Sequence, residues 1–370
     1  MKILIFAGGA GTRLWPISRK SSPKQFEILK GDKSTIAMAL DRIKDFGLEN
    51  VYVSTNDKYV DLVYSHLPEL DKNNIMGEPA RRDLAAAVGL ALMRLKKQGV
   101  SGTIAMLWAD HFMKKPDNFV EALKKADKLI AENPKRFVFL GEEPRFANEN
   151  LGWINLGENI DPVSAKASAD KSIDNEDDIL DKNLYAFNGW KYRPELLKCQ
   201  EMFESQEWMW NPGYFVFDID FVLELYKKHK PEMYIALQDM VNGEKDLATE
   251  YPKLEAESFD SAIVEKIDKD QAVVIKVGLG WTDPGTLYAL KEALVDGQDK
   301  NFEKGNVVDL DSTDSLILNE EKGRLVATVG LKGMVVVNTN NTTLVCHKND
   351  VPRIKELLKK IEEEGLESYL

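Results

Sequence analysis

Residues 1–26 read MKILIFAGGAGTRLWPISRKSSPKQF, and this stretch decides the fold class. The apolar run at residues 3–7 is typical of a buried strand, and three glycines follow it within residues 8–11. Glycine weakens a strand and lets the backbone approach another group closely. Because Arg13 and Lys24 follow in the same stretch, we expect the approached group to be anionic.

The composition is that of an acidic globular protein. The 370 residues are 44% hydrophobic and 30% charged, and 49 basic against 61 acidic side chains give a formal net charge of −12. This charge argues against a nucleic acid or an anionic membrane as the main partner. A site for a phosphorylated ligand must therefore be a local positive pocket on an acidic body.

Two features predict a cytoplasmic protein. Cys199 and Cys346 are isolated and show no metal-ligand spacing, which is typical of reduced structural thiols. The N-terminal apolar run is too short for a signal peptide, and glycines replace a cleavage region. No stretch approaches the length of a membrane span, so we expect no membrane partner.

Strand-like and helix-like runs alternate through the first two thirds of the chain. The strands are expected at residues 3–7, 51–55, 103–108 and 137–140, and the helices at 35–46, 84–97 and 118–132. This alternation predicts an α/β fold: a Rossmann-like mixed, mostly parallel sheet flanked by helices. Ligands bind at the carboxyl ends of such strands. The loop at residues 8–13 follows the first strand and Asp110 the third, so both are expected at one edge.

The composition and the pattern of the sequence change twice after this region. Residues 159–182 are polar and acidic, and we expect an exposed insertion there. From about Asn306, short β-rich runs separated by turn residues predict a small β-rich domain or β-solenoid, closed by a helix over about 351–364. The predicted domains are therefore residues 1–295 and 306–370.

The glycine loop does not fit the two common phosphate-binding motifs. In a Rossmann fingerprint the third glycine position would fall on Leu14, and a Walker A loop needs a glycine before Lys-Ser or Lys-Thr. A plain glycine turn beside solvated cations is the remaining simple interpretation.

The longer pattern resembles a known family. Gly8-Gly9-x-Gly11-Thr12-Arg13-Leu14-x-Pro16, followed by Pro23-Lys24, resembles the signature of sugar-1-phosphate nucleotidylyltransferases. The form Leu14-Trp15-Pro16-x-Ser18-Arg19 with Pro23-Lys24-Gln25-Phe26 is similar to the mannose-1-phosphate guanylyltransferase (GDP-mannose pyrophosphorylase) branch. The resemblance implies the nucleotide-diphospho-sugar transferase fold with a β-helix-like C-terminal domain. It makes Arg13 and Lys24 catalytic and assigns nucleotide binding to Ala7, Gly8, Gly9, Gly11, Thr12 and Arg13.

A second segment, GEPARRDLAAAVGLAL, resembles the nucleotide-base segment Pro-x-x-Arg-Asn-Thr-Ala-Pro of the family. Pro79, Arg82 and Ala85 match, whereas Asp83, Leu84 and Ala86 depart from the pattern. Guanine presents N1–H and N2–H₂ donors on one edge, which a carboxylate accepts together. Glu78 and Asp83 are the two candidate acceptors, with Arg82 and Ala85 beside them; alternatively, Asp83 only caps the following helix.

The resemblance also implies a Mg²⁺ site. Asp110 in LWADHF and Asp283 in GWTDPGTL match the two metal-binding aspartates of the family, and Mg²⁺ binds through one or two carboxylates plus phosphates. Taken alone, each is an ordinary loop or turn aspartate. His111 is expected to support the metal site or to pack beside it without binding the ion, because imidazole is a poor Mg²⁺ ligand.

Three further motifs match the sugar site of the family. GWINLG contributes Gly152, WNPGYFVFD contributes Asn211, and SFDSAIVEK contributes Asp260 and Glu265, which either contact the sugar or support the site. In GWKYRP, Arg193 stands where the family has lysine and Tyr192 where it has glutamate. Arg193 preserves a cation for the sugar phosphate; Lys191 is the alternative if the register differs.

The implied function is nucleotidyl transfer from GTP to α-D-mannose 1-phosphate, which yields GDP-mannose and diphosphate. Two alternatives remain: the same reaction with another nucleotide or sugar 1-phosphate, such as glucose 1-phosphate, or a non-catalytic regulatory subunit that binds sugar nucleotides. The motifs run in order from residue 1 to about 290. No cupin-type isomerase domain is expected after them, and a homodimer through the β-rich region is a further expectation.

Overall fold

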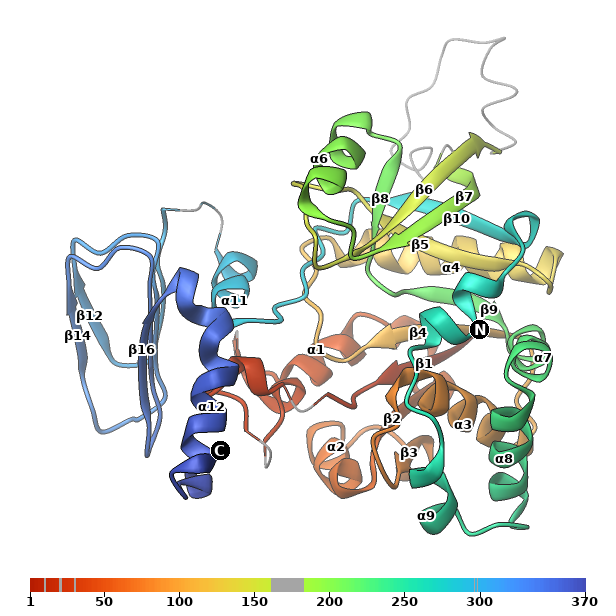
Figure 1. Cartoon of the computed structure of the whole chain (residues 1–370), viewed down its shortest axis with the longest axis horizontal. Coiled ribbons are helices and arrows are strands. Elements are labelled where there is room, and N and C mark those ends of the chain that lie inside the picture. Colours follow the sequence, from red (N-terminus) through yellow and green to blue (C-terminus); the bar gives the residue numbers. More distant parts are fainter. Residues whose placement is uncertain (10, 20–21, 30, 161–182, 296, 298) are drawn as a thin grey trace. The chain divides into compact units, whose positions relative to one another are not determined.

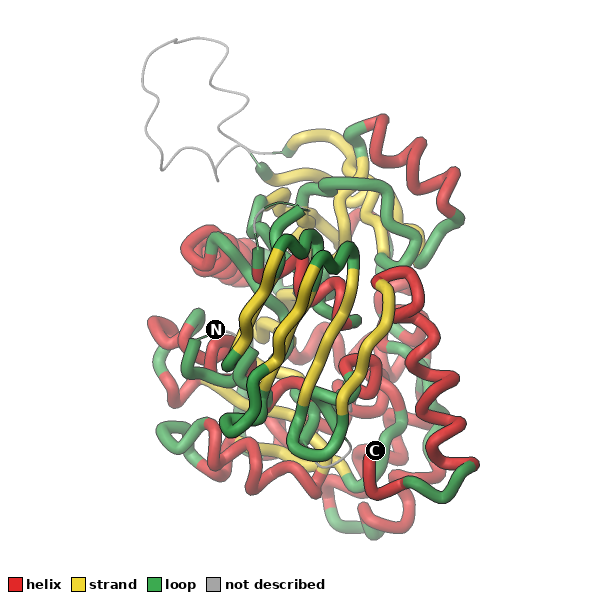
Figure 2. The backbone as a smooth tube through the Cα atoms, turned by 90° about the vertical axis from the view of Figure 1, so that its left-hand side faces the viewer, coloured by secondary structure: helices red, strands yellow, loops and turns green. Residues whose placement is uncertain are grey.

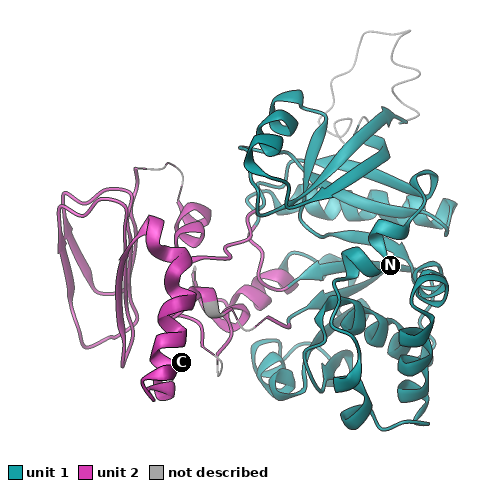
Figure 3. Cartoon of the chain, in the orientation of Figure 1, with its two compact units in different colours: residues 1–7, 41–108, 113–281 teal, residues 8–40, 109–112, 282–370 magenta. Residues whose placement is uncertain are grey.

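The computed structural model describes residues 1–9, 11–19, 22–29, 31–160, 183–295, 297 and 299–370. Most of the predicted insertion, residues 161–182, lies outside this part of the chain. The chain forms two compact units (Figure 3): residues 1–7, 41–108 and 113–281 form unit 1, and residues 8–40, 109–112 and 282–370 form unit 2. The predicted domains, 1–295 and 306–370, divide the sequence and remain a prediction; in space, residues 8–40 group with the C-terminal residues.

A ten-stranded sheet of described residues forms the centre of unit 1, in the order β10-β7-β6-β8-β5-β9-β4-β1-β2-β3 (Figure 1). Its strands are β1 (Lys2–Phe6), β2 (Val51–Asn56), β3 (Ile75–Glu78), β4 (Thr103–Trp108), β5 (Phe137–Glu142), β6 (Gly152–Asn159), β7 (Leu184–Tyr192), β8 (Trp208–Asn211), β9 (Phe215–Asp218) and β10 (Ala272–Val277). The four predicted strands therefore appear as β1, β2, β4 and β5.

The sheet is mixed, as predicted. Strands β3, β2, β1 and β4 are parallel neighbours, and β5 pairs in parallel with β10. The other described pairs are antiparallel. Phe6 pairs with Trp108, so β1 and β4 end at one edge, as expected from the sequence.

Helices cover both faces of this sheet. The longer helices of the chain are α1 (Thr35–Asp41), α2 (Val60–His66), α3 (Asp83–Lys97), α4 (Pro116–Glu132), α6 (Leu196–Ser205), α7 (Ile219–His229), α8 (Pro231–Asn242), α11 (Leu287–Leu294) and α12 (Ile354–Glu363), and α9 (Leu247–Glu250) and α10 (Phe259–Ala262) are single turns. In unit 1, α3 packs against α7 and α8, and α4 packs on β4, β5, β9 and β10. Consecutive residues of β5 are all buried, as expected when neither face meets water.

Two predicted helix boundaries are wrong. The helix expected over residues 35–46 ends at Asp41, where a carboxylate opposes the negative end of the helix dipole, and buried Ile43 has left the helical conformation. The helix expected from residue 351 begins at Ile354, because Pro352 lies in a preceding 3₁₀ segment (Lys348–Arg353).

The C-terminal strands form the predicted β-rich domain. They are β11 (Phe302–Lys304), β12 (Val307–Leu310), β13 (Leu316–Asn319), β14 (Val326–Val329), β15 (Met334–Asn338) and β16 (Thr343–His347). Strands β11, β13 and β15 are parallel with β16 antiparallel at one edge, and β12 pairs in parallel with β14. Figure 2 shows these strands side by side. Parallel strands in consecutive coils are typical of a solenoid.

A single apolar core explains why residues 8–40 belong to unit 2. Leu14 and Trp15 pack in one cluster with Leu287 of α11 and with Leu316 and Val335 of the solenoid, and all five side chains are at most 5% exposed. The Trp15 indole N–H also donates to the Tyr369 carbonyl, at 2.8 Å. The segment that carries the signature is therefore anchored in the β-rich domain.

None of the helices within the described residues is long and apolar enough to cross a membrane.

A buried ion cluster joins α11 to the solenoid. Asp314 lies 2.6 Å from the ammonium groups of both Lys291 and Lys348 and accepts a hydrogen bond from Tyr288 at 2.7 Å. Lys291 is fully buried. Partial burial raises the pKa of Asp314, but the hydrogen bonds outweigh this and lower the pKa to about 2.

We predict that Asp314→Asn destabilises the protein by about 3 kcal/mol at neutral pH, because it removes the carboxylate that pairs with the buried Lys291 ammonium. The difference in unfolding free energy between wild type and variant should have its full size above pH ~4, the unfolded pKa of aspartate. It should shrink as the pH falls through about 2. Urea unfolding as a function of pH measures it. Asp350→Asn, which breaks the exposed Arg353–Asp350 pair, is the control and should cost less than ~1 kcal/mol; equal losses would contradict the prediction.

Candidate active site

The glycine loop (residues 8–13) folds back over Lys24. Gly11 has φ +62°, and a Cβ at this position would lie 2.9 Å from the Cβ of Lys24, so both the conformation and the space require glycine. Gly9 is exposed, and a Cβ there would meet open space. The backbone of Gly9 is thus accessible to a ligand, as the predicted phosphate contact requires. The side chain of Thr12 lies outside what the structure describes.

Lys24 is the centre of the site in unit 2. It begins a 3₁₀ turn directly after Pro23, and its side chain is only 9% exposed. Its ammonium lies 2.7 Å from Oδ2 of Asp110 and 3.1 Å from Oδ1 of Asp283. The two predicted metal aspartates, 173 positions apart in the sequence, therefore converge on one cation.

A short backbone pairing brings the two aspartates together. Phe112 and Thr282 form an isolated antiparallel bridge with two N–H···O bonds, each of 3.0 Å. Asp110 lies two residues before this bridge and Asp283 one residue after it. The Phe112 side chain is buried in the same core as Leu14, so the bridge is fixed to the loop that carries Lys24.

The charges of the cluster stabilise one another. Burial lowers the pKa of Lys24, but the two carboxylates outweigh it and the pKa is raised overall. Burial raises the pKa of Asp283, whereas Lys24, His111 and Arg13 lower it, and the pKa is lowered overall. Lys24 is therefore a cation and Asp283 an anion at neutral pH.

Arg13 and His111 add positive charge beside Asp283. The guanidinium of Arg13 lies against Gly285, where a Cβ would be 3.4 Å from Nη2. Arg13 is exposed, so its fork can still bind an anion. His111 acts on Asp283 through its charge, which agrees with the supporting role expected from the sequence.

Sequence reasoning missed a buried carboxylate that holds the backbone of residues 279–281. Glu142, 2% exposed at the end of β5, accepts hydrogen bonds from the backbone N–H groups of Leu279 (2.7 Å) and Trp281 (3.1 Å). Arg145 pairs with Glu142 at 3.2 Å and donates to the Trp281 carbonyl at 2.7 Å. The only sequence signal was an acid and a base three residues apart after a strand, which many surface loops share.

The predicted base-binding residues lie in unit 1, after β3. Glu78 is 7% exposed, and Ala85 is buried in the first turn of α3. Asp83 is exposed at φ +56° and is the first residue of α3, and its Oδ1 accepts from the N–H of the next residue, Leu84, at 2.8 Å. The N-cap of α3 is Arg82, which makes no side-chain cap hydrogen bond, so Asp83 is not the N-cap residue. Arg82 is half-buried: its Nε–H donates to the Pro252 carbonyl, and Nη1 donates to the Arg81 carbonyl at 3.0 Å.

The predicted sugar-site residues also gather in unit 1. Gly152 pairs with Asn211 across β6 and β8, and a Cβ on Gly152 would lie 2.8 Å from the Trp190 indole. The Trp190 N–H points to Glu265 at 3.4 Å. Asn211 uses Oδ1 to accept from the Gly213 N–H at 2.9 Å, which leaves its amide N–H₂ for a ligand.

Electrostatics connect the predicted base and sugar residues. Burial raises the pKa of Asp260 to about 6, with contributions from the charges of Glu265 and Asp83. The carboxylates of Glu265 and Asp83 therefore both act on that of Asp260. Arg193 is exposed at φ +46° with its guanidinium 5.0 Å from the Tyr192 ring centroid, and Lys191 is also exposed. Asp83 and Arg193, both departures from the family pattern, have the left-handed conformation that is uncommon outside glycine.

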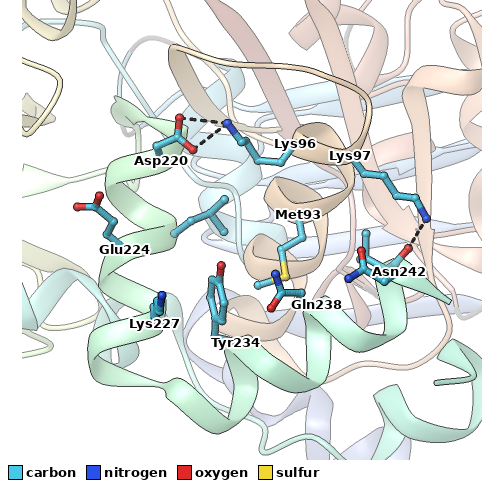
Figure 4. Close-up of a pocket in the computed structure, with 11 residues that line it drawn as sticks. Met93, Lys96, Lys97, Asp220, Glu224, Lys227, Tyr234, Gln238 and Asn242 are labelled. Carbon is cyan, nitrogen blue, oxygen red and sulfur yellow. Dashed lines mark hydrogen bonds and ion pairs between the residues drawn. The ribbon is translucent and has the colours of Figure 1, made fainter. Parts of the chain in front are cut away.

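An open pocket of about 520 Å³ lies elsewhere in unit 1, among α3, α7 and α8 (Figure 4). Two of its lysines are already partnered: Lys96 lies 2.8 Å from Asp220, and Lys97 donates to the Val241 carbonyl at 2.6 Å. None of the predicted site residues lines it.

The donor set around Lys24 fits a hard divalent cation that keeps other ligands. Oxygens of two carboxylates reach one ammonium position, and the described residues contain no cluster of three His, Cys, Asp or Glu side chains suited to a metal. Two carboxylates completed by water and phosphate are what Mg²⁺ requires, whereas zinc would need more protein ligands.

Comparisons with known proteins identify the family. The nucleotidyl transferase family model matches residues 2–300, and the MannoseP isomerase/GMP-like beta-helix domain model matches residues 305–361. Mannose-1-phosphate guanylyltransferase of Escherichia coli (strain K12) is 31% identical over 98% of this chain and 73% of that protein. The enzyme of the same name from Salmonella montevideo is 30% identical over 99% of this chain and 75% of its own length.

A solved structure covers both parts of the fold. The crystal structure of a protein described as mannose-1-phosphate geranyltransferase, from Thermus thermophilus, superposes with a TM-score of 0.83 at 26% identity and covers 98% of this chain and 99% of its own. The matches extend over the glycine loop, the aspartate cluster and the solenoid. This chain therefore belongs to the nucleotidyl transferase family, in its mannose-1-phosphate guanylyltransferase group.

Proposed function

We propose that this protein transfers GMP from GTP to α-D-mannose 1-phosphate, producing GDP-mannose and diphosphate. The observation that carries the proposal is the convergence of Asp110 and Asp283 on Lys24 beside the glycine loop. The names of the relatives supply the nucleotide and the sugar. GTP and mannose 1-phosphate are thus the proposed partners.

The reaction needs charge neutralisation more than proton transfer. An oxygen of the sugar 1-phosphate attacks the α-phosphorus of GTP in line, and the bond to the β-phosphate oxygen breaks. The attacking phosphate is already ionised, since its second pKa is about 6, so no general base is required. Arg13 and Lys24 are the proposed catalytic residues: they neutralise the charge on the reacting phosphorus and on the departing diphosphate.

Mg²⁺ is the proposed cofactor, with Asp110 and Asp283 as its ligands. Bound there, it would neutralise phosphate charge and orient the triphosphate. Lys24 pairs with the same two carboxylates and would supply a positive charge beside them.

The remaining predicted residues are proposed to hold the two substrates. Residues Ala7, Gly8, Gly9, Gly11 and Thr12 contact the triphosphate, and Glu78, Arg82, Asp83 and Ala85 form the base segment. For Arg82, this role is the backbone contact described above. Gly152, Arg193, Asn211, Asp260 and Glu265 form the sugar-phosphate site, in which the Asn211 amide donates to hydroxyls.

A matrix of nucleotides against sugar 1-phosphates tests the function. We expect diphosphate release to be fastest with GTP and mannose 1-phosphate and to stop when Mg²⁺ is chelated. Faster turnover with another pair, for example glucose 1-phosphate, would show a nucleotidyl transferase of other specificity. Binding of GDP-mannose without any turnover would instead identify a regulatory subunit.

We predict that Lys24→Ala lowers kcat/KM by about 10²-fold or more, ~2.7 kcal/mol of transition-state stabilisation, because the cation nearest the phosphates is lost. Steady-state diphosphate release measures it. Lys332→Ala, at an exposed lysine of the same unit, should leave kcat/KM unchanged. Turnover within threefold of wild type, with an unchanged melting temperature, would remove Lys24 from the mechanism.

A homodimer is proposed through the outer face of the solenoid. Leu310 of β12 pairs with Val329 of β14, and these side chains are 58% and 70% exposed; Val308, 58% exposed, lies on the same face. A second copy would bury this apolar surface. The free cysteines Cys199 and Cys346 support a cytoplasmic location for the protein.

Sedimentation velocity tests the dimer. We expect wild type to sediment as a dimer at micromolar concentration, and Leu310→Lys/Val329→Lys to sediment as a folded monomer, because charges on that face oppose its burial. A monomeric wild type, or a variant that stays dimeric, would exclude this interface.

A further inference from the structure

A buried tyrosine holds the carboxylate at the end of β3. Tyr251, fully buried in a 3₁₀ turn (Tyr251–Lys253), donates its hydroxyl to Oε2 of Glu78 at 2.7 Å. The two residues are far apart in sequence, and Tyr251 belongs to none of the motifs that resemble the family. A hydrogen bond to a charged acceptor in a buried place fixes the rotamer of the acceptor.

Two more contacts join the same segments. Arg82 donates to the Pro252 carbonyl, and the Ala85 N–H donates to the Glu257 carbonyl at 3.0 Å. Residues 251–257 therefore hold the base segment, residues 78–85, at its beginning, middle and end. Such a framework is what a precise hydrogen-bonding site needs, since it holds the acceptor in place before the ligand arrives.

The two candidate acceptors for guanine differ in this respect. The Asp83 carboxylate is exposed and partly occupied by its own helix. The Glu78 carboxylate is buried, and one hydrogen bond from Tyr251 leaves further lone pairs on both oxygens. A desolvated, oriented carboxylate discriminates more strongly between bases than an exposed one, because water competes less.

We propose that Tyr251 is a positioning residue for base recognition: its hydroxyl orients Glu78 so that this carboxylate accepts N1–H and N2–H₂ of guanine. The inference rests on the proposed function and extends it, because it names the residue pair that selects the nucleotide. Tyr251 does not touch the base itself.

The hydrogen bond also favours the ionised form of Glu78. Burial raises the pKa of Glu78, and the charge of Asp57 raises it further. The hydrogen bond from Tyr251 and the charge of Arg81 lower this pKa, but it remains raised overall. Arg94 of α3 interacts electrostatically with Asp57 and Tyr251. Removal of the Tyr251 hydroxyl should therefore raise the pKa of Glu78 further, and a protonated Glu78 no longer accepts both guanine donors.

The test compares GTP with ITP, which lacks the N2 amino group, from about pH 5.5 to 8. The triphosphates of the two nucleotides titrate alike, so the ratio of their kcat/KM values isolates the base. In wild type we expect GTP to be preferred and the preference to fall at acidic pH. In Tyr251→Phe we expect the loss of the GTP preference to occur at higher pH, and the GTP-to-ITP ratio of kcat/KM at pH 7 to drop about tenfold. The change should come from a higher KM for GTP, while kcat and the KM for mannose 1-phosphate stay unchanged.

Two variants separate positioning from stability. Tyr226→Phe removes another fully buried hydroxyl, which donates to the Ala85 carbonyl at 2.6 Å and not to Glu78; it should lower the melting temperature without moving the pH profile of the GTP-to-ITP ratio. Glu78→Gln should abolish both the preference and its pH dependence, because an amide does not titrate.

An unchanged GTP-to-ITP profile in folded Tyr251→Phe overturns the proposal, and so does loss of the preference in Asp83→Asn with Glu78→Gln unaffected. If Tyr251→Phe does not fold, two other results overturn the proposal: a GTP-to-ITP ratio in wild type that does not change with pH, or a GTP preference that is preserved in Glu78→Gln. Absence of turnover with every nucleotide would instead refute the proposed function, so the two failures are distinguishable.

Discussion

The pairing of one ammonium with two carboxylates organises the catalytic part of this protein. Lys24 is nearly buried, and its charge is tolerated there because Asp110 and Asp283 lie within 3.1 Å of it. In the same arrangement, the two carboxylates are suited to a divalent cation, and the Lys24 ammonium is suited to phosphates. In the free chain each charge is the partner of the others, so the site is assembled before any substrate binds.

Each functional segment is held by buried contacts from a distant part of the chain. Trp15 and Leu14 anchor the glycine loop in the solenoid core, and the Phe112–Thr282 bridge aligns the aspartates. Glu142 holds the backbone that precedes Asp283, and residues 251–257 hold the base segment. The solenoid thus has a structural role in the site: it supplies the core on which the signature loop is packed.

Two of the departures from the family pattern, Asp83 and Arg193, share a structural property that the buried departure Ala86 lacks. Asp83 and Arg193 both have positive φ values, and both are exposed. Neighbouring residues that match the pattern, such as Ala85 and Gly152, are buried and tightly packed. Exposed positions at the rim of a site change identity at little cost to packing, which is why differences in substrate preference are expected there.

Local sequence determined the strands and glycines of this protein. The alternation of apolar runs located β1, β2, β4 and β5, because burial on both faces leaves a continuous apolar signature. Gly11 could be recognised because only glycine satisfies its backbone angle and its contact with Lys24. Helix ends at Asp41 and Ile354 were displaced from their expected places, since they depend on which side chains are buried.

Only the tertiary structure decided which distant residues meet. No local pattern shows that Asp110 and Asp283 share the Lys24 ammonium, that Tyr251 binds Glu78, or that residues 8–40 fold with the C-terminal strands. These contacts join segments separated by up to several hundred residues, and they arise from core packing and strand pairing of the whole chain. Periodicity and motifs indicate which side chains each segment carries. The packed core determines which residues those side chains contact.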